Sequence, residues 1–110
     1  MTSPRALFQY ELTTSDDQVT ECPASKQWIV TGLYACNTTG SAVTIRLHHV
    51  TDGLPSSTGN ALFYGVSVPA NSTVELVEAA RIPINDGEEL RGLASATGIT
   101  LTGYGMEYTV

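Results

Sequence analysis

The sequence is poor in charged residues and poorer still in basic ones. Only 15% of its 110 residues are charged, against about 25% in an average soluble protein, and the net charge is −6. The basic residues are scattered along the chain, at Arg5, Lys26, Arg46, Arg81 and Arg91. Nucleic acids and anionic membrane surfaces are both bound through clustered basic side chains. We therefore expect neither a nucleic acid nor a membrane as partner.

Long apolar runs are also missing. A membrane-spanning helix needs about 18 apolar residues in succession, and no segment of the chain approaches that length. Residues 1–11 contain no continuous apolar stretch of the kind found in a secretory signal peptide. We therefore expect a product made in a host cytoplasm, where Cys22 and Cys36 are reduced thiols. The spacing of these cysteines is not a metal-binding pattern.

Groups that carry catalysis or hold metal ions are scarce. His48, His49 and Asp52 form a metal-like cluster, but adjacent residues of a strand point to opposite faces, which keeps the two imidazoles apart. We expect one of these histidines to be buried with a hydrogen bond and the other to lie on the surface. Nucleophile-elbow, phosphate-loop and EF-hand patterns are absent, and residues 85–89 are typical of a turn before a strand. We expect no catalytic residue, no metal ligand, no cofactor and no enzymatic activity.

What the sequence does have is a hydrophobic period of two, which is typical of half-buried strands. Val43, Ile45 and Leu47 alternate with polar residues and predict a strand over residues 42–50. Residues 27–37 are apolar at successive positions and predict a central strand covered on both faces. Further strands are predicted over residues 7–13, 61–68, 73–79, 89–94 and 99–109.

Turn-forming residues separate these strands. Tight turns are predicted at residues 37–40, 69–71 and 85–87, where Asn, Gly, Pro and Asp occur. Residues 51–60 form a longer polar loop, residues 14–20 an exposed loop, and residues 1–5 a flexible N-terminal arm. About seven to eight strands at this spacing predict an all-β protein, a single-domain β-sandwich or jelly roll over residues 1–110.

Four phrases occur in an order that resembles a known group of proteins. They are CPASKQWIVTGLYACN at residues 22–37, AVTI at 42–45, VSVPANSTV at 66–74 and NDGEEL at 85–90, followed by a closing strand with Gly103, Gly105 and Glu107. Over residues 19–110 this order resembles the small β-sandwich virion structural proteins of tailed bacteriophages. The resemblance implies a non-enzymatic head decoration or cement protein, a homotrimer in the virion that contacts the major capsid protein or other virion proteins. A neck, tail or fibre accessory is the other position it implies.

Two questions stay open at the level of sequence. A receptor- or carbohydrate-binding module is the alternative function, and it predicts exposed aromatic rings, such as Trp28 or Tyr64, beside the loop at residues 51–60. The apolar side chains near the N-terminus are Leu7, Phe8, Tyr10 and Leu12. They form either an assembly arm that pairs with the sheet edge of a neighbouring subunit or a strand inside their own sandwich.

Overall fold

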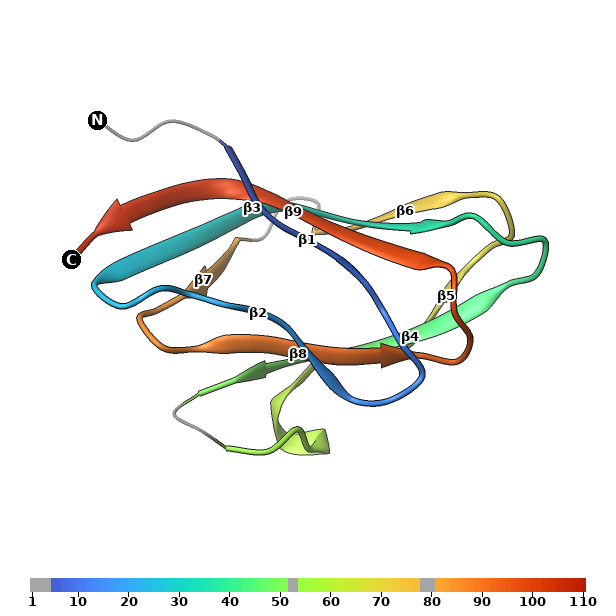
Figure 1. Cartoon of the computed structure of the whole chain (residues 1–110), viewed down its shortest axis with the longest axis horizontal. Coiled ribbons are helices and arrows are strands. Elements are labelled where there is room, and N and C mark those ends of the chain that lie inside the picture. Colours follow the sequence, from blue (N-terminus) through green and yellow to red (C-terminus); the bar gives the residue numbers. More distant parts are fainter. Residues whose placement is uncertain (1–4, 52–53, 78–80) are drawn as a thin grey trace.

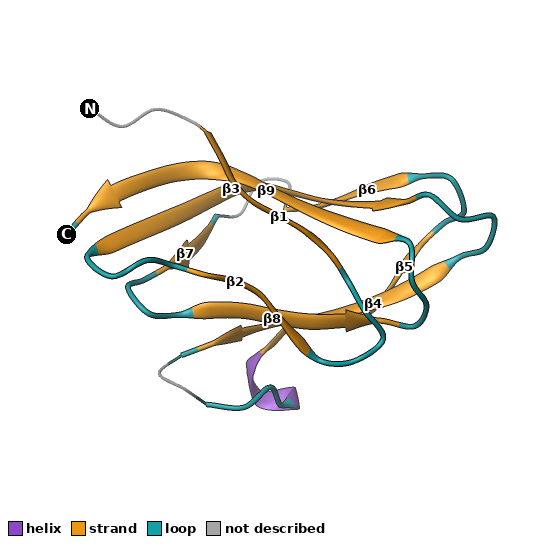
Figure 2. Cartoon of the chain, in the orientation of Figure 1, coloured by secondary structure: helices purple, strands orange, loops and turns teal. Residues whose placement is uncertain are grey.

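A computed structural model describes residues 5–51, 54–77 and 81–110, and within these ranges the chain is almost entirely β-structure (Figures 1 and 2). Its nine strands are β1 (Arg5–Glu11), β2 (Asp17–Glu21), β3 (Lys26–Asn37), β4 (Val43–Val50), β5 (Ala61–Val68), β6 (Thr73–Val77), β7 (Ile82–Ile84), β8 (Glu89–Ala94) and β9 (Ile99–Thr109). One turn of 3₁₀ helix, η1 (Thr58–Asn60), precedes β5. No helix in the described ranges has the length and apolar character needed to cross a membrane.

The strands form two antiparallel sheets that pack face to face. The five-stranded sheet has the order β1-β9-β3-β6, with β7 also paired to β3, and the four-stranded sheet has the order β2-β8-β4-β5. Figure 1 shows the first sheet above the second, with the connections at the two ends of the sandwich. The predicted all-β sandwich is thereby confirmed, with nine strands in the described residues rather than seven or eight.

The core lies between the two sheets and follows from the alternation of the strands. β3 and β9 contribute Val30, Leu33 and Leu101 from one sheet, and β4 contributes Ile45 and Leu47 from the other, all of them 0% exposed. Burying such side chains is worth about 1.5–3 kcal/mol each relative to leaving them in water. The period of two in the sequence is therefore the main determinant of this arrangement.

The outer face of β3 departs from the sequence prediction. β3 is central in its sheet, between β9 on one side and β6 and β7 on the other. Its outward side chains, including Ile29, Tyr34 and Cys36, are only half-buried. The prediction that β3 is covered on both faces is wrong, because the second sheet covers one face and no further layer of described residues lies on the other.

Most predicted strand bounds agree closely with the structure, but two strands were missed. β2 falls in the predicted exposed loop at residues 14–20, where Val19 is 7% exposed and packs into the core. This strand carries a single core side chain and a register shift between Gln18 and Thr20, so it has no readable alternation. β7 is short and contains Pro83, which suits an edge strand. The end of the predicted strand at residues 73–79 lies outside the described residues.

The N-terminal strand pairs within its own sandwich. β1 runs antiparallel to β9 from the pair Arg5 and Gly105 to the pair Glu11 and Thr100. Arg5, predicted to be in a flexible arm, is thus part of a strand, and the rest of that arm lies outside the described residues. Leu12, just after β1, is 1% exposed in the core.

A second contact anchors β1 to the sheet. Phe8 stacks on Trp28 with ring centroids 6.3 Å apart, and a Cβ placed on Gly103 would lie 2.3 Å from the ring of Phe8. Gly103 therefore provides the space in which the Phe8 ring sits. Of the two arrangements predicted for Leu7, Phe8, Tyr10 and Leu12, these residues have the intramolecular one in this structure of a single chain.

The packing of Leu12 leads to a test of this arrangement. Replacing Leu12 with Ala removes a fully buried side chain, and we expect the free energy of unfolding of the isolated chain to fall by about 2–5 kcal/mol. Glu11→Ala, at the exposed neighbouring position, is the control and should stay within about 0.5 kcal/mol of the parent. Urea unfolding measures both. Equal stability of Leu12→Ala and the parent would mean that β1 does not pack in its own sandwich.

Candidate functional site

A groove lies on the outer face of the four-stranded sheet. Its volume is about 620 Å³, within the range of about 300–1,000 Å³ usual for small-molecule sites. The sheet forms its floor, and the loop at residues 54–60 forms one wall. Its polar lining includes Asp16, Arg46, His48, Ser56, Tyr64 and Arg91.

The strand alternation places these side chains. In β4, Arg46 and His48 alternate with the core residues Ile45 and Leu47, so they face away from the core. Arg46 is the cross-strand partner of Tyr64 on β5, and His48 is the partner of Arg91 on β8. The groove floor is thus a set of neighbouring outward residues on three adjacent strands.

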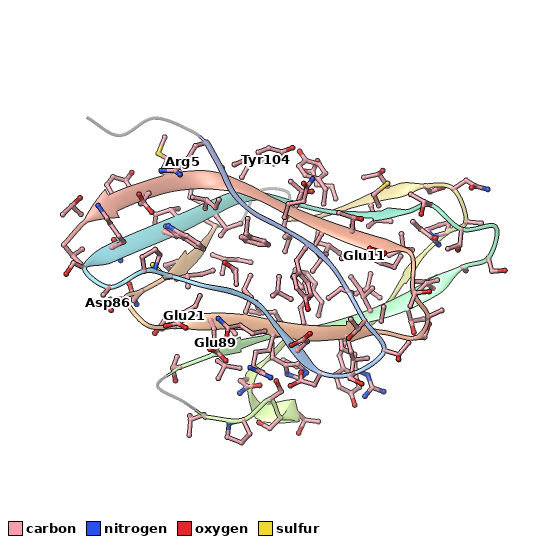
Figure 3. All side chains as sticks on the ribbon, in the orientation of Figure 1. Arg5, Glu11, Glu21, Asp86, Glu89 and Tyr104 are labelled. Atoms are coloured by element: carbon pink, nitrogen blue, oxygen red, sulfur yellow. The ribbon has the colours of Figure 1, made fainter. Side chains whose placement is uncertain are left out.

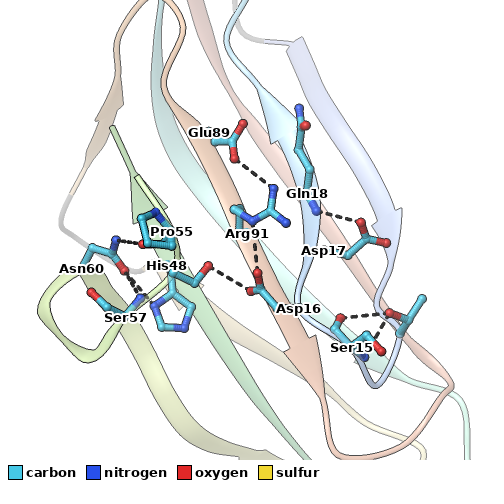
Figure 4. A network of polar contacts seen from close by, with 12 residues as sticks. Ser15, Asp16, Asp17, Gln18, His48, Pro55, Ser57, Asn60, Glu89 and Arg91 are labelled. Atoms are coloured by element: carbon cyan, nitrogen blue, oxygen red, sulfur yellow. Dashed lines mark hydrogen bonds and ion pairs between the residues drawn. The ribbon is translucent and has the colours of Figure 1, made fainter. Parts of the chain in front are cut away.

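His48 anchors the loop that forms the wall (Figure 4). Its Nδ1 lies 3.0 Å from Oδ1 of Asn60, which also accepts the backbone N–H of Ser57, while Asn60 Nδ2 donates to the carbonyl of Pro55. Because the amide oxygen faces the imidazole, Nδ1 carries the hydrogen in neutral His48. Nε2 then holds a lone pair, and no hydrogen bond is made to it within the described residues. His48 is only 6% exposed, as expected for one of the two histidines.

Arg91 is held by two carboxylates. Its Nε lies 3.1 Å from Asp16 Oδ2, and its Nη1 lies 3.0 Å from Glu89 Oε1. These hydrogen bonds, with Glu89 the stronger influence and Asp16 next, raise the pKa of Arg91. Ser56 donates to the other oxygen of Asp16 at 3.0 Å and ties the wall of the groove to the loop between β1 and β2 (Figure 4). The charge of Arg91 is therefore paired with protein carboxylates, which engage two of its five N–H donors.

Arg46, unlike Arg91, is not paired with a carboxylate in the described residues. Its guanidinium lies 4.3 Å from the centroid of the Tyr64 ring, a cation–π contact that fixes its position. It makes no ion pair and no hydrogen bond within the described residues, and the Tyr64 side chain beneath it is 53% exposed. The groove thus contains one cation whose fork of N–H donors is open to a ligand.

His49 belongs to a separate cluster at the turn between β7 and β8. Its Nε2 lies 2.8 Å from Glu88 Oε1, which also accepts the backbone N–H of Asn85 at 2.9 Å. Burial alone would raise the pKa of Glu88, but the hydrogen bonds from Asn85 and His49 outweigh it, and the pKa is lowered. His49 is half-buried in this contact rather than free on the surface, and it does not meet His48 at a common site.

The outer face of the five-stranded sheet is the second notable surface. Its centre consists of the outward side chains of β3 and β9, which we call the tyrosine face: Ile29, Tyr34, Thr100, Thr102, Tyr104, Met106 and Tyr108. Tyr104 is 45% exposed and meets Tyr34 edge-on, with centroids 5.9 Å apart. None of these residues is charged, and Figure 3 shows Tyr104 on the outside of the sheet.

The two surfaces bear on several sequence predictions. Tyr64 does lie beside the loop that was expected to flank a binding site. Trp28 does not, because it is 5% exposed and donates from Nε1 to Glu107. The sequence did not single out Arg46, Asp16 or Arg91 as site residues. Arg46 is nevertheless one of the polar residues that alternate with apolar ones in residues 42–50. Among the described residues, no group of three potential metal ligands occurs.

The cysteines are both free, as expected of reduced thiols. Cys22 is fully buried, and Cys36 is half-buried on β3. Desolvation is the main cause that raises the pKa of the Cys22 thiol. Cys22 is therefore a small core residue rather than a reactive one.

Comparison with known proteins supports the fold only. No protein-family model and no curated protein matches the sequence. Among solved structures, the chain is similar to a protein from the work entitled "Bacillus endospore appendages form a novel family of disulfide-linked pili". The TM-score is 0.56 at 14% sequence identity, and the match covers 100% of this chain and 88% of that one. The neighbour thus has a related β-rich fold, and it carries no link to bacteriophages.

The Glu88 cluster leads to a pH prediction. A lowered folded pKa means that ionised Glu88 stabilises the fold above its ordinary pKa of 4.5, and that this contribution is lost as the pH falls through the lower folded value. The parent should therefore be more stable than Glu88→Gln at pH 7, and the gap should shrink as the pH falls below 4.5 and through the lower folded value. Urea midpoints at several pH values measure it, with exposed Glu11→Gln as control. A gap that is constant across this range would contradict the prediction.

Proposed function

We propose that this chain is a non-enzymatic structural subunit that works by binding other proteins in an assembly. More specifically, we propose a decoration or cement protein on the head of a tailed bacteriophage, bound in the virion to the major capsid protein and forming a homotrimer. The order of phrases along residues 19–110 supports the bacteriophage assignment. The tyrosine face is the structural observation that supports an assembly role most.

The composition of the tyrosine face suits a protein interface. Tyr and Met are enriched at the centres of such interfaces, while charged residues are depleted there and gather at the rim. On this sheet the acidic residues Glu11 and Glu75 lie on the flanking strands β1 and β6, and the centre is uncharged. Tyrosine also buries a large area at a small cost in side-chain entropy, because it has only two rotatable bonds.

The sheet edges favour closed symmetry. In the described residues, β1 pairs only with β9, and β5 pairs only with β4, so each leaves one side of its backbone without a strand partner. Exposed edges invite uncontrolled pairing between chains. A ring of copies about a rotation axis would cover such edges without leaving a growing end, which is the physical reason for proposing a homotrimer. The structural neighbour belongs to a protein described as forming pili, another kind of assembly, and supports only the general role.

A charge placed at the centre of the tyrosine face should prevent assembly. We expect Tyr104→Lys to fold normally and to lose at least tenfold in affinity for undecorated capsids, because an unpaired ammonium would be buried at the contact. Ser67→Lys adds the same charge at an exposed position of the other sheet and should bind like the parent. Co-sedimentation with capsids measures both. Equal binding of Tyr104→Lys and the parent would exclude this face as the contact.

Copy number in the particle checks the position proposed for the protein. A head decoration protein is present in hundreds of copies, whereas a neck or tail protein is present in on the order of a dozen or fewer, as the symmetry of those parts requires. Quantitative mass spectrometry of purified virions gives this number. Analytical ultracentrifugation of the free protein gives the oligomeric state, and a stable monomer that never joins particles would contradict the proposal.

A carbohydrate-binding module is the second candidate, and one observation favours it. The exposed ring of Tyr64 lies at the groove beside the hydroxyl-bearing loop that includes Ser56 and Ser57. The part of this ring that the Arg46 guanidinium leaves exposed lies among hydrogen-bonding side chains and is a suitable surface for a sugar. A glycan array separates the candidates, because an assembly subunit alone should bind none of its members.

A further inference from the structure

From the groove we infer a ligand class: we propose that it binds a carboxylate-bearing sugar, with Arg46 as the residue that recognises the carboxylate. This inference rests on the second proposed function, the carbohydrate-binding module. It concerns a face opposite to the tyrosine face, so it is compatible with an assembly role as well. Some polar groups of the groove are already paired with protein groups, and others are available to a ligand.

Among the described residues that line the groove, Arg46 is the cation that no carboxylate pairs. Arg91 is paired with Asp16 and Glu89, whereas Arg46 has no ion pair or hydrogen bond within the described residues. The guanidinium carbon of Arg46 lies over the Tyr64 ring, 4.3 Å from its centroid, and this contact holds the group in place. A guanidinium held in place presents two parallel N–H donors, which match the two oxygens of a carboxylate.

The opposite end of the groove offers acceptors and hydroxyls. Nε2 of His48 holds a lone pair without a partner in the described residues, and His48 is only 6% exposed. Ser56 holds its hydroxyl against Asp16, and further hydroxyls come from Ser57 and Thr58 in the wall. These groups suit the hydroxyls of a sugar, which donate and accept hydrogen bonds. They would leave a purely anionic ligand, such as phosphate, poorly matched.

The spacing of the two ends fits one ligand. Arg46 and His48 are two residues apart on β4, which corresponds to roughly 7 Å along the strand. A ligand that meets both must therefore carry its carboxylate and its hydroxyls at different ends. The carboxylate belongs at the Arg46 end, because Asp16 and Glu89 make the His48 end acidic.

The negative net charge of the chain does not attract an acidic sugar, so recognition must come from the groove itself. The net charge of −6 repels anionic ligands at long range, so general attraction does not assist binding. Affinity for an acidic sugar must then depend on Arg46 itself. This property separates the proposal from nonspecific binding to basic surfaces.

The test compares matched sugars on the full-length chain. The probes are a uronic acid disaccharide and the neutral disaccharide in which each carboxylate is replaced by a hydroxymethyl group. Dissociation constants come from NMR titration of the ¹⁵N-labelled protein. We expect the acidic disaccharide to bind at least tenfold more tightly than the neutral one, with the shifted resonances on β4, β5 and residues 54–60.

Variants identify the groups responsible. Arg46→Gln should lower the affinity for the acidic disaccharide about tenfold or more and leave the neutral one nearly unchanged. Arg81→Gln removes the same charge at an exposed position of the chain outside the groove and should have little effect. Tyr64→Ala should weaken binding of the acidic disaccharide, because it removes the ring against which the Arg46 guanidinium is held. Circular dichroism confirms that each variant is folded.

Other outcomes would overturn the proposal at distinct levels. If neither disaccharide binds, the carbohydrate-binding function itself fails. If both bind equally, that function stands and the assignment of a carboxylate to Arg46 fails. Equal losses in Arg46→Gln and Arg81→Gln would mean a general charge effect. An Asp- and Glu-containing peptide that binds as tightly as the acidic disaccharide would make the groove a protein contact instead.

Discussion

The antiparallel pairing of β3 with β9 is the interaction on which the rest of the structure depends. The pairing extends from Lys26 opposite Thr109 to Asn37 opposite Ile99. A bulge between Val30 and Gly32 shifts its register. β1, β6 and β7 all attach to this pair, and the core side chains of one layer come mainly from it. β3 comes early in the chain and β9 comes at its end, so this pairing joins segments that are far apart in sequence. Both candidate surfaces depend on this pairing. Its outer side chains form the tyrosine face, and its inner side chains form the core against which the second sheet packs.

Sequence reasoning found the elements in which hydrophobic alternation is long enough to read. The strands at residues 61–68, 89–94 and 99–109 were predicted with the bounds they have in the structure, because apolar residues recur along each of them. β2 escaped notice because its stability comes from pairing with β8 and from one buried residue, Val19. No local pattern encodes such a contact. The over-prediction of burial for β3 has a related cause: apolar residues such as Ile29 and Cys36 indicate an apolar surface, and only the fold shows whether another layer covers it.

The groove was only partly predictable for a different reason. Tyr64 and the polar loop were visible as an aromatic residue and a loop, but their neighbours come from three strands and the loop between β1 and β2. Arg46 is distinguished from Arg91 only by what each one touches. Of the two carboxylates that pair with Arg91, Glu89 lies two residues before it on the same face of β8, but Asp16 lies 75 residues away in sequence. The tautomer of His48 likewise depends on an amide twelve residues away. Open and satisfied groups are therefore properties of the tertiary structure, whereas residue types are properties of the sequence.

The tyrosine face and the groove lie on the outer faces of the two sheets, and so on opposite sides of the sandwich (Figure 1). A chain bound through the first surface necessarily turns the second one outward. In any array of such chains the grooves would be repeated at fixed spacing, each pointing into solvent. Binding to a polymer with repeated groups then becomes multivalent, and the avidity of the array can exceed the affinity of a single groove by about 10²–10⁴ without any new contact. A groove that binds weakly in a single chain can for this reason be an effective attachment site on a particle.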